Sequence, residues 1–387
     1  MDERKSLRCS IIRGGTSKGI FIKENELPDD PAARDAVIRA VFGSPDIRQI
    51  DGLGGADVLT SKLAIIGPPS RPDADVDYTF GQVSFETDKI DYSGNCGNIS
   101  SAVGPYAIDE GMVRADGEAA FVRIHMKNTG RILRAEVPTR DGRAVETGDF
   151  AIDGVPGTGA RITLDWSDTA GGVTGKLLPT GNVKDQVCIE GKNYEVSLVD
   201  AGNPLVFIRA EALGMTGTES PDEIENNAEL MRTIEKIRGW AAARIGLCER
   251  PEEAARVTPY NPFFAIVSKP QSYRAINGKE IREQEIDITA RLLFMLRMHK
   301  AYPITGTAAT AAAVRIPGSV AWEVLREEAK NRETICIGHP SGKLPAESIV
   351  SVEDGRIQLK KIGVYRTARR IMDGRVYLPE GIDIGKG

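Results

Sequence analysis

One cysteine lies in the part of the chain that is best suited to chemistry. Asn95, Gly97 and Asn98 flank Cys96, and the run of small residues that follows, as far as Ile108, predicts a buried helix. A thiol at such a loop-to-helix junction faces unpaired backbone N–H groups and the positive end of the helix dipole. Both favour thiolate over thiol, and both can receive a carboxylate. The alternative is a small apolar cysteine packed beneath the start of a helix.

A glycine-rich loop near the N-terminus could bind an anion. Arg13–Gly19 has the sequence RGGTSKG and joins two predicted strands. Its glycines let the backbone approach a ligand, while Thr16, Ser17 and Lys18 carry polar groups that can donate hydrogen bonds. The spacing differs from that of a P-loop and no helix follows. A plain hairpin turn is the alternative for this loop.

A lysine follows a second glycine-rich loop. Asp51–Ala56 runs into Ser61 and Lys62, and Lys62 opens an apolar strand. A lysine at the mouth of a strand beside such a loop is a candidate for a desolvated amine, because burial favours the neutral form. The commoner alternative is an exposed lysine.

Bulk composition limits the class of protein. The chain has 387 residues, enough for two domains with full cores, and its net charge of −5 with a pI near 5.6 argues against a nucleic-acid partner. No apolar run approaches the roughly 18 residues of a membrane span. The charged start leads straight into a strand, so we expect no signal peptide and a cytoplasmic location. Five cysteines without C-x-x-C spacing indicate reduced thiols, and Cys9, Cys188 and Cys336 are expected in the core.

Periodicity and turn residues predict an α+β fold. The expected strands cover residues 7–12, 20–22, 62–66, 77–85, 119–126, 132–137, 194–200, 205–208 and 265–270. The expected helices cover residues 32–42 with a cap at Asp30, the segment after Cys96, 220–245 ended by Gly246, 286–299 and 304–314. The expected domains are 1–182 and 183–370, with a boundary in the Gly-Pro-Thr segment 178–182 and a tail, 371–387, that packs back on the first domain.

A short internal echo indicates a repeat. Asn95–Asn98 and Ile304–Thr307 share the pattern x-[Cys/Thr]-Gly-[Asn/Thr], and each precedes a small-residue helix. Glycine-containing strand–loop–strand pieces, around Ser17 and around Asn203, come before them in the same order. We therefore expect two similar halves, each a sheet wrapped around one helix, with both helix N-termini facing a shared cleft where ligands bind.

At this point the sequence resembles a known family. The motifs that carry the resemblance are Arg13–Gly19, Asp51–Gly55, Ser61–Lys62, Asn95–Asn98, Asp200–Pro204 and His339–Gly342. They are similar to those of the PrpF-like, cofactor-free isomerases of the diaminopimelate epimerase-like fold: 2-methylaconitate isomerases, 3-methylitaconate delta-isomerases and 4-oxalomesaconate tautomerases. Overall likeness favours the 3-methylitaconate delta-isomerases. Where the epimerases have a second cysteine this chain has Thr305, whose alcohol cannot be a second acid or base, so the resemblance implies a one-sided proton shift.

The resemblance implies that Lys62 and Cys96 lie at the reacting carbon of a branched unsaturated dicarboxylate. We expect the Lys62 amine to remove a proton and Cys96 to orient the substrate or shuttle a proton, although the roles could be exchanged. Because the intermediate gains charge on a carboxylate, cations and N–H donors must face it. The implied substrate-binding residues are Thr16, Ser17, Ser61, Asn95, Gly97, Asn98, Asn203, Lys269, Tyr273, Lys300, Thr305, Gly306 and Thr307.

Several alternatives stay open on the sequence alone. The substrate could be 3-methylitaconate, 2-methylaconitate or 4-oxalomesaconate, and a non-catalytic dicarboxylate-binding accessory protein is the rival from another class. The histidines at 125, 299 and 339 form no close pair, so we expect no metal site and no cofactor. Small symmetric assemblies are common among soluble enzymes, which favours a homo-oligomer, a dimer or a tetramer.

Overall fold

The computed structural model describes residues 5–353 and 356–382. The chain forms two compact units, Met1–Thr163 with Arg366–Gly387, and Leu164–Tyr365. The sequence had placed these divisions after residues 182 and 370. The first lies earlier because the glycine-rich segment after residue 164 is bound to the second unit: the Gly171 N–H donates to the Asp200 carbonyl at 2.8 Å, and Ala170 bridges Ala201.

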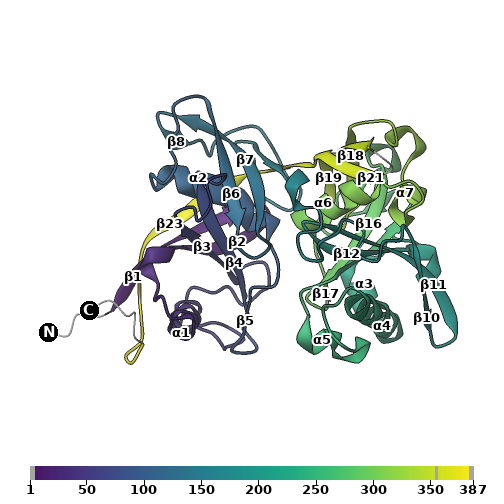
Figure 1. The fold of residues 1–387 in the computed structure, drawn as a ribbon, viewed down its shortest axis with the longest axis horizontal. Helices are drawn as coiled ribbons and strands as arrows, with labels where there is room; N and C mark the ends of the chain where they lie inside the picture. Colours follow the sequence, from purple (N-terminus) through teal and green to yellow (C-terminus); the bar gives the residue numbers. More distant parts are fainter. Residues whose placement is uncertain (1–4, 354–355, 383–387) are drawn as a thin grey trace. The chain divides into compact units, whose positions relative to one another are not determined.

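The first unit is a mixed sheet with a buried helix. Its main elements are β1 (Ser6–Gly14), β2 (Ser17–Lys23), α1 (Pro31–Phe42), β3 (Lys62–Gly67), β4 (Val76–Val83), β5 (Ile90–Asp91), α2 (Gly97–Asp109), β6 (Ala119–Met126), β7 (Arg131–Arg140), β8 (Arg143–Ala144) and β23 (Ala368–Tyr377). The order β23-β1-β2-β3-β4-β6-β7 has parallel pairs only at β2–β3 and β4–β6. The last strand thus returns to pair with the first (Figure 1).

The two faces of this sheet pack against different helices. Ile20, Ile22, Leu63 and Ile65 lie in one apolar cluster with α1, whose predicted cap is confirmed because the Asp30 carboxylate accepts from the Ala33 N–H at 2.8 Å. The other face packs against α2, which contacts β1, β2, β3, β6, β7 and β23. The sheet therefore wraps around α2, as predicted.

The second unit repeats this arrangement. Its elements are β9 (Ile162–Asp165, at the junction), β10 (Asp185–Ile189), β11 (Lys192–Ala201), β12 (Asn203–Arg209), α3 (Pro221–Glu225), α4 (Ala228–Arg244), α5 (Ala254–Val257), β13 (Phe263–Ser268), β14 (Tyr273–Arg274), β15 (Glu280–Ile281), β16 (Ile288–Phe294), β17 (Arg297–Met298), α6 (Ile304–Ala313), α7 (Val320–Val324), β18 (Thr334–His339), β19 (Gly342–Glu347), β20 (Ile349–Glu353), β21 (Arg356–Lys361) and β22 (Gly363–Arg366). The pairs β11–β12, β12–β13, β13–β16, β16–β18 and β18–β19 alternate between antiparallel and parallel as in the first unit.

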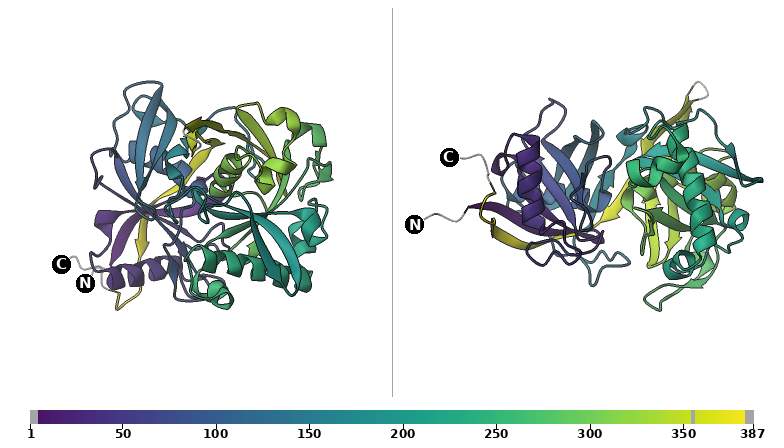
Figure 2. Two further views of the ribbon diagram at one scale, coloured as in Figure 1. Left: turned by 45° about the vertical axis from the view of Figure 1, so that its right-hand side comes forward. Right: turned by 90° about the horizontal axis from the view of Figure 1, so that it is seen from below.

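The repeat extends to the helices. α4 covers one face of β10–β13 through a cluster that includes Ile234, Ile237, Val206 and Phe264, in the place that α1 takes in the first unit (Figure 1 and Figure 2). α6 is buried along its whole length and packs against β11, β12 and β19, in the place of α2. The predicted pair of similar halves is confirmed.

One predicted helix was wrong, and another is divided in two. The segment 286–299 contains β16 and β17, joined by a tight turn in which Met295 and Leu296 have φ of 50° and 60°. Every residue of β16 is buried. A strand that is covered on both faces has a continuous apolar sequence, and periodicity alone does not distinguish such a sequence from a helix. The segment 220–245 is helical as predicted but consists of α3 and α4, and the Asn227 side chain caps α4 by accepting from the Leu230 N–H at 3.0 Å.

The predicted burial of the cysteines was only partly right. Cys9 is buried, Cys336 is half-buried and Cys188 is exposed on β10. Cys188 alternates with Val187, which is the residue of that strand that enters the core. In the part of the chain that the structure describes, no helix combines the length and the apolarity needed to cross a membrane.

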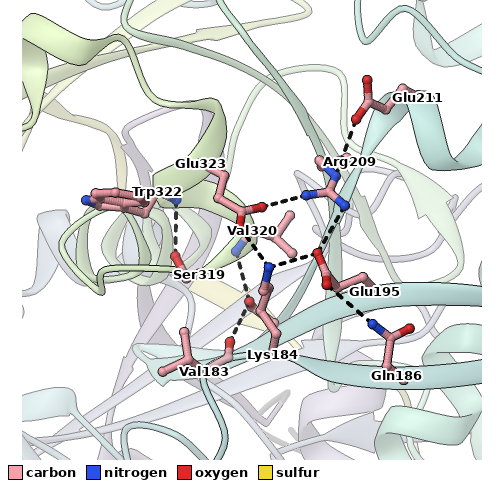
Figure 3. A network of polar contacts seen from close by, with 11 residues as sticks. Val183, Lys184, Gln186, Glu195, Arg209, Glu211, Ser319, Val320, Trp322 and Glu323 are labelled. Carbon is pink, nitrogen blue, oxygen red and sulfur yellow. Dashed lines mark hydrogen bonds and ion pairs between the residues drawn. The ribbon is translucent and has the colours of Figure 1, made fainter.

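A charged network holds α7 against the strands of the second unit (Figure 3). Lys184 contacts the Glu195 and Glu323 carboxylates at 3.0 and 2.7 Å, and Arg209 contacts the same two carboxylates at 3.0 and 2.5 Å. Beneath it, the Val320 N–H donates to the Ser197 hydroxyl at 3.0 Å. Because α7 follows α6 in the chain, this network also fixes the end of the central helix.

A second charged cluster closes the end of α2 in the first unit. The Glu110 carboxylate lies 2.9 Å from Lys23 and from Arg370 and 3.8 Å from Arg8, and its side chain is 6% exposed. Burial raises the pKa of Glu110, but the hydrogen bonds from Lys23 and Arg370 outweigh it and hold the pKa below its ordinary value. The carboxylate therefore stabilises the fold at neutral pH.

Glu110→Gln is expected to lower the free energy of unfolding by about 1–3 kcal/mol at neutral pH, because charge-assisted hydrogen bonds to two cations are lost. A carboxyl whose pKa is depressed by folding contributes stability above its unfolded pKa and loses it as the pH falls through the folded pKa. The difference between variant and wild type should therefore vanish well below about pH 4. Urea unfolding at neutral and acid pH measures the free energy of unfolding of both proteins. An equal difference between them at the two pH values would contradict the ion-pair explanation.

Candidate functional site

The first turn of α2 carries the cysteine. Cys96 is the N-cap residue, with extended backbone and a relative exposure of 8%, and its carbonyl accepts from the Ser100 N–H at 2.8 Å and the Ser100 hydroxyl at 2.9 Å. The neighbouring Asn95 amide donates to the Thr129 hydroxyl at 3.1 Å. N–H groups in the first turn of a helix have no acceptor within the helix and lie at its positive end. The predicted loop-to-helix junction is thus confirmed.

The N-terminal glycine loop lies against this turn. The Asn98 amide donates to the Thr16 hydroxyl at 2.9 Å and to the Ser17 hydroxyl at 3.3 Å. The backbones approach so closely that a Cβ atom on Gly14 would lie 2.2 Å from the Asn98 carbonyl oxygen, and Gly15 has a positive φ of 51°. Both glycines are therefore required by the contact. The structure brings together Thr16, Ser17 and Asn98, as the anion-site prediction needs.

Lys62 is buried at the start of β3, with 2% relative exposure. Its amine donates to the Gln82 side-chain oxygen at 2.8 Å and lies 5.4 Å from the centre of the Phe80 ring. The Gln82 amide in turn donates to the Ser61 carbonyl at 3.0 Å, while the Ser61 hydroxyl donates to Gln49 at 2.5 Å. The amine is therefore desolvated and fixed, and the exposed-lysine alternative is wrong.

The sheet register directs this lysine toward α2. Lys62 is the partner of Gly19 on β2, and a Cβ atom on Gly19 would lie 2.9 Å from Ile99 in the first turn of α2. On the same face of β2, the Phe21 ring lies 5.4 Å from the ring of Tyr106 on α2. Paired residues of neighbouring strands share a face. The Lys62 side chain therefore lies on the face of the sheet that packs against the first turn of α2.

Arg366 is a further member of this site that sequence reasoning missed. It is 2% exposed, its Nε donates to the Asn98 side-chain oxygen at 3.2 Å, and its Cδ would lie 3.0 Å from a Cβ atom added to Gly15. Burial lowers the pKa of Arg366 to about 9. Its sequence neighbours form an Arg-rich run typical of a solvated strand. The role of Arg366 becomes visible only in the structure, where the C-terminal part of the chain packs on the first unit.

The second unit contains a related arrangement without the reactive groups. The Asn203 amide donates to the Thr305 hydroxyl at 2.9 Å, and a Cβ atom on Gly202 would lie 3.2 Å from the Thr305 backbone. By strand register, Phe263 takes the place of Lys62 and Phe294 the place of Gln82, and these two rings are 5.3 Å apart. At these corresponding positions of the described residues, the first unit has a buried lysine and a cysteine, whereas the second has phenylalanine and threonine. The predicted shared cleft stays a prediction.

Comparison with known proteins identifies the family. A family model described as PrpF protein matches residues 4–379. The chain belongs to the PrpF family. Among PrpF-family relatives, it is 50% identical to the 3-methylitaconate isomerase of Eubacterium barkeri over 98% of both chains. It is 41% identical to the 4-oxalomesaconate tautomerase of Pseudomonas putida over 95% of both, and 38% identical to the 2-methyl-aconitate isomerase of Cupriavidus necator over 96% of both.

Solved structures agree with this assignment to the PrpF family. A crystal structure of methylitaconate-delta-isomerase matches with a TM-score of 0.85 and 49% identity, over 100% of this chain and 98% of the other. A hydroxyproline epimerase from Agrobacterium vitis matches with a TM-score of 0.60 at 13% identity, over 99% of this chain and 95% of the other, which shows the fold alone. The predicted two-domain epimerase-like fold and the family resemblance are confirmed.

Three other predicted binding residues of this PrpF-family chain, Lys269, Tyr273 and Lys300, lie in the second unit. Lys269 and Lys300 are exposed. The Tyr273 hydroxyl donates to the His339 and Gly342 carbonyls, both at 2.7 Å, so it holds a turn of the second unit. All three residues belong to the second unit, and their part in binding the substrate stays a prediction.

The remaining predicted residues lie in the first turns of α6. Gly306 and Thr307 are buried, and the Thr307 hydroxyl donates to the Pro303 carbonyl at 2.9 Å. Each of the three histidines has a local polar contact: His125 with Asp77 at 2.9 Å, His299 with the Ala301 N–H at 3.0 Å and His339 with the Ser341 N–H at 3.2 Å. Within residues 5–353 and 356–382, no group of three or more His, Cys, Asp or Glu residues is arranged to hold a metal ion.

Proposed function

We propose that the chain is a cofactor-independent isomerase that shifts a C=C bond in a branched unsaturated dicarboxylate, converting 3-methylitaconate to 2,3-dimethylmaleate. The observation that carries the proposal is the buried Lys62 amine on the sheet face that packs against α2, the helix capped by Cys96. The 3-methylitaconate isomerase relative, identical at half of the aligned positions, supports this choice of substrate.

The chemistry is a 1,3-proton transfer. The Lys62 amine removes the proton from the methine carbon next to a carboxylate, and the electron pair forms a C=C bond to the neighbouring carbon. The electrons of the original C=CH₂ bond take a proton from the Cys96 thiol and convert the methylene to a methyl group. The proton on Lys62 then returns to sulfur, directly or through solvent, so the enzyme is unchanged at the end of the cycle.

Charge stabilisation is required because the substrate is a dianion whose intermediate carries more negative charge on one carboxylate. One opposite charge at about 4 Å contributes roughly 4 kcal/mol at an effective dielectric of about 20, which is too little alone. We propose that the N–H groups of the α2 first turn, the Thr16 and Ser17 hydroxyls and the Arg366 guanidinium bind the carboxylates. A guanidinium presents a planar pair of donors that matches a carboxylate.

Proton NMR in D₂O tests the proposal. The enzyme should convert 3-methylitaconate and incorporate deuterium into the new methyl group of the product. 2-Methylaconitate and 4-oxalomesaconate, whose isomerases are also relatives, belong in the same panel, and faster turnover of either would reassign the substrate. Binding without any exchange would overturn the catalytic proposal in favour of a dicarboxylate-binding accessory protein.

Cys96→Ser is expected to lower kcat by about 10²-fold or more, because an alcohol is a far weaker acid than a thiol and general acid catalysis contributes about 10²–10⁴-fold. The matched control is Cys188→Ser, which changes an exposed thiol of the second unit and should keep full activity. Rates of methyl-group formation followed by NMR make the comparison. A Cys96→Ser variant with near-normal turnover would show that the thiol is only a neighbour of the reacting carbon.

We also propose a cytoplasmic homo-oligomer of two or four chains. All five cysteines are free thiols, which suits a reducing compartment. Closed symmetric assemblies are the commonest state of soluble enzymes. Light scattering coupled to size-exclusion chromatography gives the number of chains, and fractionation of cells that express the protein gives its location.

A further inference from the structure

A tyrosine outside the predicted site has a buried hydroxyl that the fold does not use. Tyr78 on β4 is 0% exposed. Within the described part of the chain its hydroxyl makes no hydrogen bond of standard geometry. Burying such a group without a partner is costly, and native proteins rarely leave one. The presence of a buried hydroxyl at this position therefore needs a specific explanation.

The strand register places Tyr78 on the same side of the sheet as the Lys62 amine. Tyr78, Phe80 and Gln82 are alternate residues of β4, so their side chains lie on the same face of the sheet. In the pairing with β3, Gln82 is the partner of Lys62 and Tyr78 is the partner of Ile66. This is the face that packs against α2, since Leu63 and Ile65 on the opposite face belong to the α1 cluster.

Tyr78 lies close to the start of α2. Its carbonyl accepts from the Lys127 N–H at 2.9 Å, and two residues further on the Thr129 hydroxyl accepts from the amide of Asn95, the residue before Cys96, at 3.1 Å. Burial, and next the Coulombic effect of Cys96, raise the pKa of Tyr78 well above its ordinary value. The Ser100 side chain lowers this pKa as a hydrogen-bonding neighbour, although its contact with the tyrosine hydroxyl falls outside standard hydrogen-bond geometry. Ser100 is itself bound to the Cys96 carbonyl at 2.9 Å. Cys96 and Ser100 are thus the polar groups that act on the tyrosine hydroxyl.

The repeat of the fold provides an internal comparison. By register, the second-unit residue that corresponds to Tyr78 is Ala290, which pairs with Val267 as Tyr78 pairs with Ile66. The residue that corresponds to Cys96 there is Thr305. At these two positions the first unit therefore has a tyrosine and a cysteine, whereas the second unit has an alanine and a threonine. A role in packing alone would not require this association.

We propose that Tyr78 is a positioning residue for Cys96, whose hydroxyl donates a hydrogen bond to the sulfur when Cys96 gives up its proton. This inference rests on the proposed function. A protonated sulfur is a weak acceptor, which fits a hydroxyl without a standard hydrogen bond. Once the thiol protonates the substrate methylene, the sulfur becomes an anion and a strong acceptor, and the hydroxyl stabilises it without itself losing its proton.

Tyr78→Phe removes the hydroxyl and keeps the ring. We expect kcat to fall about ten- to a hundredfold with KM changed less than about twofold, because the lost hydrogen bond to a charged group forms only after proton transfer. The unfolding temperature should not fall, because a buried hydroxyl without a hydrogen bond is removed.

Iodoacetamide labelling at Cys96, quantified by mass spectrometry of its peptide, gives a readout that needs no substrate. Loss of the donor lowers the thiolate fraction at neutral pH, while the remaining thiolate becomes more nucleophilic. A tenfold loss of thiolate should then slow alkylation by about threefold. This labelling result remains informative even if none of the dicarboxylates is turned over, so the inference and the proposed function can fail separately.

Tyr302→Phe is the matched control. Tyr302 is equally buried in the second unit, but its hydroxyl is bonded to the Thr310 hydroxyl at 2.9 Å. This change should lower the unfolding temperature and leave kcat and Cys96 labelling unchanged. For Tyr78→Phe, unchanged kcat, or reduced kcat with unchanged labelling, would overturn the assignment to the sulfur. If the phenylalanine variant does not fold, Tyr78→Leu provides the same two measurements.

Discussion

Lys62→Met is expected to lower kcat for isomerisation by about 10²–10⁴-fold while the protein remains folded, since general base catalysis contributes about that factor. Methionine fills nearly the volume of the lysine stem, and it removes the amine that donates to Gln82 at 2.8 Å. It also places no charge in a position with 2% exposure. Initial rates by NMR and thermal unfolding of the same samples separate a chemical loss from a folding defect.

Lys62→Arg distinguishes a base from a positive charge at this position. A guanidinium stays protonated and cannot accept the substrate proton, yet it would still attract the carboxylates. We expect this variant to be as inactive as Lys62→Met in turnover while it retains more affinity for the substrate. Near-normal turnover by Lys62→Arg would assign Lys62 to electrostatic binding and leave the base unidentified. Lys176→Met, at an exposed position of the second unit, is the control for loss of a surface lysine.

The parts of the site that lie in loops were readable from the sequence. Thr16, Ser17 and Asn98 are flanked by glycines that the close backbone approach requires, so their composition marks the contact that the structure shows. The association of Lys62 with Cys96 followed from the resemblance to the PrpF-like isomerases. Local signals suffice where a functional residue ends one element and starts the next.

Residues inside buried strands were not readable. Tyr78 and Gln82 occupy alternate positions of an eight-residue strand that is almost wholly buried, and a tyrosine or glutamine in such a run carries no local mark of function. The same property made β16 resemble a helix. What separates these positions is the register against β3 and the helix on that face, which are long-range features.

The division of the chain shows the same limit. A Gly-Pro-Thr segment is a good local signal for a linker, yet residues 170–174 are bound to Asp200, whose carboxylate accepts from the Val173 and Thr174 N–H groups at 3.0 and 2.7 Å. The return of β23 to β1 pairs residues more than 350 positions apart. Neither contact has a local sequence signature, and the second one places Arg366 in the first unit.

Arg366→Gln is expected to lower kcat/KM by about 10²–10³-fold, mainly through KM, because a donor aimed at a substrate carboxylate is worth about that factor. The free protein should not lose stability. Folding lowers the pKa of Arg366 to about 9, so the unfolded chain holds this proton more tightly and burial of the charge disfavours folding at neutral pH. A neutral amide of similar shape removes that penalty and can still donate to Asn98.

The effect of Arg366 on the free energy of unfolding also depends on pH in a direction that can be measured. The disadvantage of burying Arg366 is fully present below about pH 9 and fades as the pH rises above it, since the folded state then releases the proton before the unfolded state does. The stability advantage of Arg366→Gln over wild type should therefore shrink above about pH 9. Arg369→Gln, an exposed neighbour on β23, should change neither stability nor KM.

Ligand-induced stabilisation completes the test of Arg366. A dicarboxylate that binds only the folded state raises the unfolding temperature of wild type by an amount set by its concentration relative to Kd, and this shift should be lost in Arg366→Gln but kept in Arg369→Gln. An Arg366→Gln variant that is destabilised, yet binds and turns over 3-methylitaconate as wild type does, would show that the buried guanidinium supports the fold around Asn98 and does not contact the substrate. Loss of affinity without loss of stability is the outcome that only a ligand-binding cation explains, because a structural arginine would show the reverse.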